Sequence, residues 1–338
     1  MAYGFGYGYR LGKRTKAAAL LSTAIILPFS DASPVYQVGS AQSSNLLALA
    51  SYSRSGAKYE LLANGSLLSC AADAPGLQAG EGYWSRASIT NLNPYSNTTS
   101  DAGWSANNVT KTAGQSDPVT GTDAALVACG AGNSPHYLNS PSVTYAGSGT
   151  VFTVSRLVKP ITGSTWYQMV LNGTPFGANA YANFNLTGSG SMGTIGANLL
   201  AAGIQVMANG WYRIWVRATL LANSTASTIV AFINSGTDAR LAVITSTATC
   251  YQTGAQAVAS TTVGPIIVTG ASSAALAADG LTLNNVVNGT YDFIFTFDDD
   301  STQTISGAVV TGGSYTLPVH PTVLNRPKVK RVQGTRTA

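Results

Sequence analysis

The chain has 338 residues, of which 18 are Lys or Arg and 13 are Asp or Glu, so that only 9% of its residues are charged. An ordinary soluble domain carries about 25% charged residues, and a chain this poor in charge does not resemble a cytosolic metabolic enzyme. Apolar residues make up 45% and glycine contributes 36 residues, a composition that suits short strands between tight turns and argues against intrinsic disorder.

The cations are concentrated at the two ends of the chain. Four cations precede residue 17 and five follow residue 325. Residues 21–325 contain the other nine cations and all 13 acids, so their net charge is −4. A basic tail can meet nucleic acid, a membrane surface or an acidic protein. Because the chain carries no nucleic-acid-reading motif, we expect no specific nucleic-acid partner.

Residues 1–45 are predicted to form an N-terminal arm or anchor. The stretch Tyr3–Tyr9 alternates aromatic residues with glycine and suits an extended conformation. The apolar run Ala17–Phe29 follows a basic stretch, which is the pattern of a secretory signal, but it is shorter than the roughly 20 residues that a membrane helix needs. We therefore expect no membrane span, and an arm that packs against a neighbouring subunit.

Residues 46–90 are predicted to form a short β-hairpin segment. Two strand-like runs, Lys58–Leu62 and Ser66–Cys70, flank the pair Asn64-Gly65. An Asn-Gly pair favours a tight hairpin turn, because both residues of such a turn adopt positive φ.

Residues 91–275 are predicted to form a β-sandwich. Its clearest hairpin runs from Ile204–Met207 through Asn209-Gly210 into Trp211–Val216, with alternate side chains on opposite faces. One face carries Trp211, Arg213 and Trp215, and the other carries Tyr212, Ile214 and Val216. The other predicted strands are Thr150–Val158, Trp166–Leu171, Tyr181–Leu186, Thr228–Ile233 and Leu241–Ile244, with a last strand and linker in Ala255–Ala278. Short strands at such spacing indicate a sandwich or barrel.

Residues 276–338 are predicted to form a small C-terminal β domain with a basic tail. In Thr290–Phe297 four aromatic residues alternate with other residues and face one way, and Thr302–Val310 can pair back onto this strand. The intervening acids, Asp298–Asp300, could hold a calcium ion, but they lack the alternate spacing of a calcium loop, and a solvated turn is the simpler interpretation.

The sequence offers no catalytic or metal-binding motif. The two histidines, His136 and His320, lie beside proline, and no G-x-S-x-G surrounds a candidate serine. The three cysteines are far apart and show no metal-ligand spacing. Gly188, Gly190 and Gly193 match a dinucleotide-binding pattern, but no helix start and no acidic residue follow them as that site requires. We predict a non-enzymatic protein with no catalytic residues, no metal and no cofactor.

The aromatic residues are the most informative set for function. In a β-sandwich, Trp rings can stack on the apolar face of a sugar while Asn and Thr neighbours bind its hydroxyls. For any single Trp the simpler interpretation is a place in the core. The predicted glycan-binding residues are Trp104, Trp166, Trp211, Arg213 and Trp215.

Several segments resemble a β-sandwich module of tailed-bacteriophage structural proteins, which is similar to carbohydrate-binding jelly rolls. They are Asn91–Ser96 with Gly103-Trp104-Ser105, then Tyr181–Leu186 with Gly193–Gly196, and the hairpin Asn209–Arg213. Upstream, residues of Arg54–Pro75 resemble the short segment that often precedes the module. The resemblance covers roughly residues 50–275, and the Asn-Gly-Trp-Tyr-Arg hairpin is its most specific part.

The resemblance implies an all-β chain, a jelly-roll β-sandwich to which the N-terminal arm and the small C-terminal β domain are added. It implies a virion structural protein, such as a tail, fibre, spike or capsid-surface component. We expect the arm to bind other virion proteins and the sandwich to contact host surface polysaccharide. Virion appendages are commonly symmetric, so we expect a homo-oligomer, most simply a trimer.

Three other functions stay open at the level of sequence. The chain could be a purely architectural capsid decoration or tail component that binds only other virion proteins. It could be a glycan-degrading enzyme, which requires two carboxylates about 5–10 Å apart in a groove. A secreted adhesin is the fourth interpretation.

Overall fold

The computed structural model describes residues 23–338, so the predicted Tyr3–Tyr9 stretch and the first four cations lie outside the described residues. The chain is all-β and divides into two compact units. The first contains Met1–Arg54, Asp73–Ala87 and Ala278–Ala338, and the second contains Ser55–Ala72 and Ser88–Ala277. Within residues 23–338, no helix has the length and apolar character required to cross a membrane.

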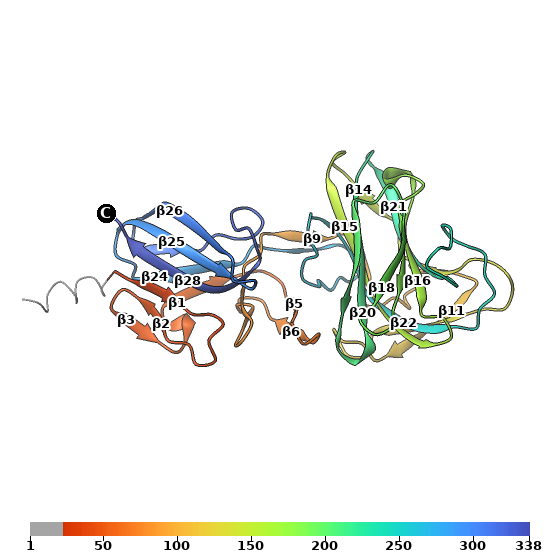
Figure 1. Cartoon of the computed structure of the whole chain (residues 1–338), viewed down its shortest axis with the longest axis horizontal. Coiled ribbons are helices and arrows are strands. Elements are labelled where there is room, and N and C mark those ends of the chain that lie inside the picture. The colour runs from red at the N-terminus through yellow and green to blue at the C-terminus, as the bar shows by residue number, and fades with distance from the viewer. Residues whose placement is uncertain (1–22) are drawn as a thin grey trace, which may run out of the picture. The chain divides into compact units, whose positions relative to one another are not determined.

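The first unit combines strands from both ends of the chain. Its large sheet has the order β26-β25-β28-β1-β2-β3 (Figure 1). Strand β8 pairs with β28 and with β7. A smaller sheet has the order β27-β24-β4. The strands are β1 (Ile25–Leu27), β2 (Tyr36–Val38), β3 (Ala41–Ser43), β4 (Ala50–Ser53), β7 (Leu77–Gln78), β8 (Gly82–Trp84), β24 (Gly280–Asn284), β25 (Gly289–Phe297), β26 (Thr302–Val310), β27 (Ser314–Thr316) and β28 (Lys328–Arg336), with a short 3-10 helix at Leu46–Ala48.

The alternation predicted for β25 is confirmed. Its four aromatic side chains are all buried in the core of the first unit, and β26 pairs back onto the strand as expected. The three acids between β25 and β26 form the turn, where Asp298 and Asp299 pair with Arg326, and Asp300 pairs with Lys330. The buried aromatic residues are Tyr291, Phe293, Phe295 and Phe297.

The predicted arm over residues 1–45, the segment over residues 46–90 and the separate domain over residues 276–338 require correction. Residues 46–54 and Asp73–Ala87 belong to the first unit, whereas Ser55–Ala72 belongs to the second. In the described part of the arm, β1 pairs with β28, with Ile25 opposite Gly334. Ile25, Leu27 and Phe29 from the apolar run belong to the same core as the aromatic residues of β25. The C-terminal strands therefore complete their sheet and core with residues from the N-terminal part of the chain.

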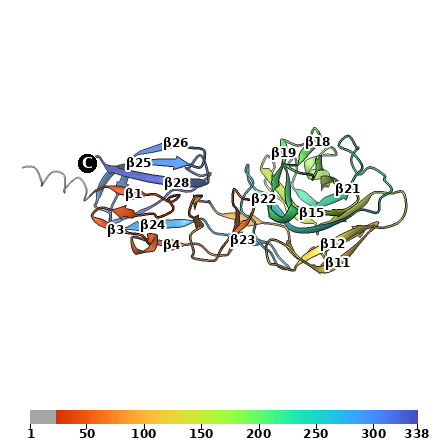
Figure 2. The same cartoon turned by 60° about the horizontal axis from the view of Figure 1, so that its bottom comes forward.

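The second unit is a two-layer sandwich. One layer, called here the β20 sheet, has the order β11-β12-β22-β15-β20-β19, and the other, the β16 sheet, has the order β10-β13-β21-β16-β17-β18, with β14 on β21. Figure 1 shows β15 and β20 on one side of the unit and β16 and β21 on the other, and Figure 2 shows β11 beside β12. The strands are β10 (Ser105–Asn107), β11 (Val109–Gln115), β12 (Ala124–Cys129), β13 (His136–Asn139), β14 (Val143–Tyr145), β15 (Val151–Thr162), β16 (Trp166–Asn172), β17 (Tyr181–Asn185), β18 (Ser191–Ile195), β19 (Ala201–Val206), β20 (Tyr212–Thr219), β21 (Ser224–Phe232) and β22 (Thr249–Ala259).

The strand pairing identifies a jelly roll. Eight strands pair in sequence order from the two ends of the module toward its middle. The pairs are β12 with β22, β13 with β21, β15 with β20, and β16 with β17. These pairs alternate between the two sheets, which is how a double-sheet jelly roll is wound. The predicted jelly-roll sandwich is therefore confirmed.

Two small β ribbons and two short 3-10 turns accompany the sandwich. A hairpin of β5 (Lys58–Leu61) and β6 (Leu67–Cys70) follows the predicted strands, and β9 (Ile89–Asn91) pairs with β23 (Ala274–Leu276). Short 3-10 turns lie at Thr174–Phe176 and Ala208–Gly210. The unit ends at Ala277, close to the predicted boundary.

The two predicted Asn-Gly turns differ. Asn209 and Gly210 both have positive φ, at 58° and 74°, as a tight hairpin turn requires. At the other hairpin only Gly65 has positive φ, and the turn is a longer loop closed by Leu62 and Ser66. The predicted strand Leu241–Ile244 is also wrong, because only Ile244 forms a bridge, to Ser134, and residues 234–241 form a loop.

This loop, residues 234–241, lies against the outer face of the β16 sheet. Two buried amides hold it: Gln168 binds Ala239 O and Leu241 N, and Asn183 donates to Gly236 O and Asp238 O. The side chain of Asp238 accepts hydrogen bonds from Asn234 N, at 2.7 Å, and from Ser235 N and Oγ. The loop is thus fixed both to the sheet and within itself.

The Asp238 carboxylate should make the order of this loop depend on pH. Burial raises the pKa of Asp238, but the hydrogen bonds from Ser235 and Asn234 lower it more, and the pKa lies below its usual value. A carboxylate with a depressed pKa stabilises the folded loop above about pH 4, and the effect is lost as the pH falls through the folded-state pKa. We expect amide-exchange protection at Leu241 to fall below about pH 4. Asp238→Asn should show the low protection already at neutral pH, and full protection in that variant would contradict the prediction.

Candidate functional site

The structure does not bring the five predicted glycan-binding residues into one site. Trp211, Arg213 and Trp215 lie on the outer face of the β20 sheet, as the alternation predicts, while Tyr212, Ile214 and Val216 lie in the core between the sheets. Trp166 begins β16 in the other sheet, and Trp104 precedes β10. Three of the five, Trp104, Trp211 and Arg213, are 1%, 4% and 3% exposed and offer no surface to a ligand.

Trp104 belongs to the core of the sandwich. Its ring centroid lies 4.5 Å from the guanidinium carbon of Arg156, and its Nε1 donates to Tyr95 O. Arg156 is fully buried and donates to Leu138 O, Thr228 O and the side chain of Gln252. Burial lowers the pKa of Arg156 to about 9, so the cation depends on these neutral acceptors and on the ring of Trp104.

Trp211 and Arg213 are covered by other parts of the second unit. Trp211 packs with Leu157 and Met207, and side chains of the β5–β6 hairpin close over this cluster. Ala208 N donates to Gly65 O, which ties the hairpin tip to the turn before β20. The guanidinium of Arg213 donates to Ser155 Oγ and, at 2.7 Å, to Gly264 O. These two predicted residues therefore hold the covering segments in place.

Among the three predicted residues on the outer face of β20, Trp215 is the one that stays half-buried. Its ring lies against Gly203 of the neighbouring strand β19, where a Cβ atom would stand only 2.6 Å from Cζ2 of the ring. The guanidinium carbon of Arg217, two residues further along the same face, lies 5.3 Å from the ring centroid. Opposite Arg217, β19 carries the small residue Ala201. A flat ring flanked by a cation results, here called the Trp215 platform: Trp215, Arg217, Gly203 and Gln205.

Two polar groups at the platform have no partner among the described residues. Gln205 lies opposite Arg213 on β19, one step along the face from Trp215, and its Oε1 is buried and unpaired. Nε of Arg217 is likewise buried and unpaired. Buried polar atoms are nearly always hydrogen-bonded in folded proteins.

Trp166 is also half-buried but lies on the other sheet. Its ring packs against Gly236 of the 234–241 loop, where a Cβ would stand 2.5 Å from Cη2, and Gly193 of β18 lies against the same glycine. Gly193 is one of the three glycines of the dinucleotide-like pattern. All three belong to the β17–β18 turn and strand, so the pattern has a structural origin.

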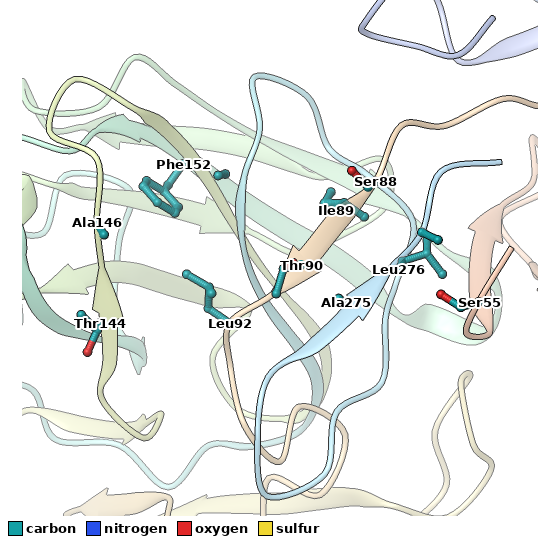
Figure 3. A pocket seen from close by; sticks show the side chains of 12 residues that line it. Ser55, Ser88, Ile89, Thr90, Leu92, Thr144, Ala146, Phe152, Ala275 and Leu276 are labelled. Carbon is teal, nitrogen blue, oxygen red and sulfur yellow. The ribbon is translucent and has the colours of Figure 1, made fainter. Parts of the chain in front are cut away.

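A pocket of about 540 Å³ opens in the second unit between the β9–β23 ribbon and the ends of β14 and β15 (Figure 3). Its apolar lining comes from residues such as Leu92, Phe152 and Leu276, and its polar lining is limited to Ser and Thr. The lining contains no charged residue. Phe152 is only 3% exposed, so the pocket offers no open aromatic ring.

Two carboxylates of the second unit, Asp117 and Asp238, accept hydrogen bonds within their own loops. Asp117 accepts backbone hydrogen bonds from Val119, Thr120 and Asp123, and these lower its pKa although burial acts to raise it. Asp238 is held in the 234–241 loop in the same way. In residues 23–338, no three His, Cys, Asp or Glu side chains gather in a group that could hold a metal ion.

Sequence reasoning missed Arg217 and Gln205. The position of Arg217 could have been predicted, because it continues the alternation of Trp211, Arg213 and Trp215 on the same face of the strand. Gly203 and Gln205 depend on the register between β19 and β20, which the residues alone do not fix.

Comparisons with known proteins identify no family. No protein-family model matches the chain, and the curated proteins contain no match to it. Among solved structures, the chain is similar to the CBM22-1 xylan-binding domain from Paenibacillus barcinonensis Xyn10C, with 14% identity and a TM-score of 0.29, over 52% of this chain and 99% of that domain. The CBM22-1-CBM22-2 tandem domain of the same protein gives 11% identity and a TM-score of 0.29, over 75% of this chain and 91% of the tandem. At these values the likeness says nothing about a ligand of this chain.

Replacing the buried Trp104 should destabilise the protein more than replacing the half-buried Trp215. Trp104→Ala removes a buried ring from the core together with its contact to Arg156, and we expect a loss of about 3–5 kcal/mol in the free energy of unfolding. Trp215→Ala, the matched control, removes a half-buried ring and should cost less than about 2 kcal/mol. Urea unfolding followed by circular dichroism measures both, and equal losses would contradict the assignment of Trp104 to the core.

Proposed function

We propose that this protein is a non-catalytic structural component of a bacteriophage particle, which displays a jelly roll that binds a neutral host surface glycan at the Trp215 platform. The observation that carries the glycan part is the half-buried ring of Trp215, laid flat on Gly203 beside the unpaired polar atoms of Gln205 and Arg217. The virion part rests on the sequence resemblance of residues 50–275 to phage structural modules.

The platform has the chemistry of a sugar site. A pyranose presents C–H groups on its faces and hydroxyls at its edge, so it can stack on an indole while its edge forms hydrogen bonds. The half-buried side-chain amide of Gln205 would form a hydrogen bond with a hydroxyl, and the guanidinium of Arg217 would donate one. The ring lies on the backbone of β19, so little side-chain freedom is lost when a ligand binds.

The platform binds without catalysing. Hydrolysis of a glycosidic bond needs a carboxylic acid and a second carboxylate on either side of the bond. None of the four platform residues carries a carboxylate, and Asp117 and Asp238 are engaged in their own loops. Release of reducing sugar from a bound polysaccharide would overturn this part of the proposal.

Weak binding at one platform suits a displayed protein. A single ring with two hydrogen-bonding groups gives modest affinity, and many copies on one particle raise the effective affinity. A symmetric oligomer, most simply a trimer, would present several platforms together. Locating the chain and counting its copies in an intact particle tests the virion part, and its absence from purified particles would refute it.

The glycan part is tested with the full chain on an array of neutral bacterial surface oligosaccharides. Wild type should bind at least one of them, and Trp215→Ala should weaken that binding by about 10-fold or more, which is 1.4 kcal/mol. Gly203→Val should also weaken it, because the added Cβ displaces the ring while Trp215 itself is kept.

Trp166→Ala is the matched control, because it removes a ring of similar burial from the other sheet. It should bind the neutral glycan as wild type does. No binding by wild type, or equal loss in Trp166→Ala and Trp215→Ala, would contradict the platform.

A further inference from the structure

The outer face of the β16 sheet carries a second set of side chains that the Trp215 platform does not use. Three buried apolar residues, Val170, Ile229 and Ala231, form its floor. Tyr137, Tyr181 and Leu241 pack on this floor and are only half-buried. The strands β16 and β21 that carry the floor lie side by side in Figure 1.

The register places these residues in rows across four strands. In one row, Ile229 lies between its cross-strand partners Asn139 and Val170, and Val170 in turn lies opposite Tyr181. This row of four residues spans about 14 Å at the usual strand spacing. The neighbouring row begins with Tyr137, opposite Ala231. The phenol groups of both tyrosines form no hydrogen bond with the described residues, and Oδ1 of Asn139 is buried and unpaired.

Arg240 supplies a cation to this face. It lies in the 234–241 loop next to Leu241, and its Nη2 donates to Asn172 Oδ1 at 2.9 Å, at the end of β16. Its Nε is buried and unpaired, and Arg240 forms no ion pair among the described residues. The nearest acid in sequence, Asp238, is directed to Asn234 and Ser235 instead. The loop is fixed on the sheet through Gln168, so the arginine is held over the face.

We propose that this face is a second binding site, specific for an oligosaccharide that carries a carboxylate, such as one built from uronic acids. The tyrosine rings take the apolar faces of the sugars, Asn139 and the phenols bind hydroxyls, and Arg240 binds the carboxylate. Arg240 forms no ion pair among the described residues, so its guanidinium can form a charge-assisted pair with a carboxylate, which is stronger than its hydrogen bond to a neutral hydroxyl. Arg217 differs because its guanidinium carbon lies 5.3 Å from the ring centroid of Trp215. The site lies on the opposite sheet from Trp215 and stands independently of the function proposed for that platform.

The test uses the full chain and a matched pair of probes, polygalacturonate and the same polymer with its carboxylates methyl-esterified. Alginate, hyaluronan and polysialate extend the set of acidic probes. We expect affinity electrophoresis to show binding to at least one acidic polymer, and at least 10-fold weaker binding to the esterified form if polygalacturonate is the ligand. Binding should weaken as salt rises, since a charge pair at a partly exposed site is screened.

Variants separate this site from the Trp215 platform. Arg240→Gln and Tyr181→Ala should each weaken binding of the acidic polymer about 10-fold or more, and Trp215→Ala should leave it unchanged. Circular dichroism of each variant establishes that the sandwich is folded. No binding to any acidic polymer, equal binding of the esterified form, or unchanged binding by a folded Arg240→Gln variant would overturn the proposal. If the wild-type protein binds an acidic polymer but no neutral glycan, only the proposal for the Trp215 platform is overturned.

Discussion

The antiparallel pairing of β15 with both β20 and β22 is the constraint on which the second unit depends. In these strands successive side chains point to opposite faces, so a fixed register assigns every residue either to the core or to the outer surface. Once Tyr212, Ile214 and Val216 fill the core, Trp211, Arg213 and Trp215 must lie outside. The same rule on the other sheet buries Tyr167 and Met169 and turns Val170 outward.

What becomes a candidate site then depends on which part of each outer face is covered. On the β20 sheet, the β5–β6 hairpin and the segment around Gly264 cover Trp211 and Arg213 and stop short of Trp215. On the β16 sheet, the 234–241 loop covers Gln168 and Asn183 and leaves the tyrosine face half-buried. The Gly264 segment is held by the buried guanidinium of Arg213, and the 234–241 loop by the buried amides of Gln168 and Asn183. The β5–β6 hairpin is tied by the backbone hydrogen bond from Ala208 N to Gly65 O, so each face has a defined border.

The scarcity of charge has a physical role in this arrangement. Arg156 lies in the core among neutral acceptors, and Arg213 is buried where it holds a covering segment. Arg217 remains half-buried beside the ring of Trp215, and Arg240 remains half-buried on the other sheet, where it donates to Asn172 Oδ1. A half-buried cation interacts strongly with a charged or polar ligand, because water screens it less and few other charges lie nearby. The two proposed sites therefore differ mainly in where each arginine is held, beside the ring of Trp215 for Arg217 and in the 234–241 loop for Arg240.

The sequence by itself determined the all-β class and the two faces of β20 and of β25, because alternation and turn residues are local signals that survive folding. The jelly-roll module was predicted from the resemblance of several segments to a known β-sandwich module. It also placed the end of the sandwich near residue 276. Tertiary structure alone decided that β1 completes the sheet of β28, that Trp104 supports a buried arginine, and that Leu241 belongs to a loop. These outcomes depend on pairings between residues far apart in the chain, whose partners and register no local pattern specifies. For the same reason Trp215 could be proposed from sequence, whereas Gly203 beneath it and Arg240 on the opposite sheet could not.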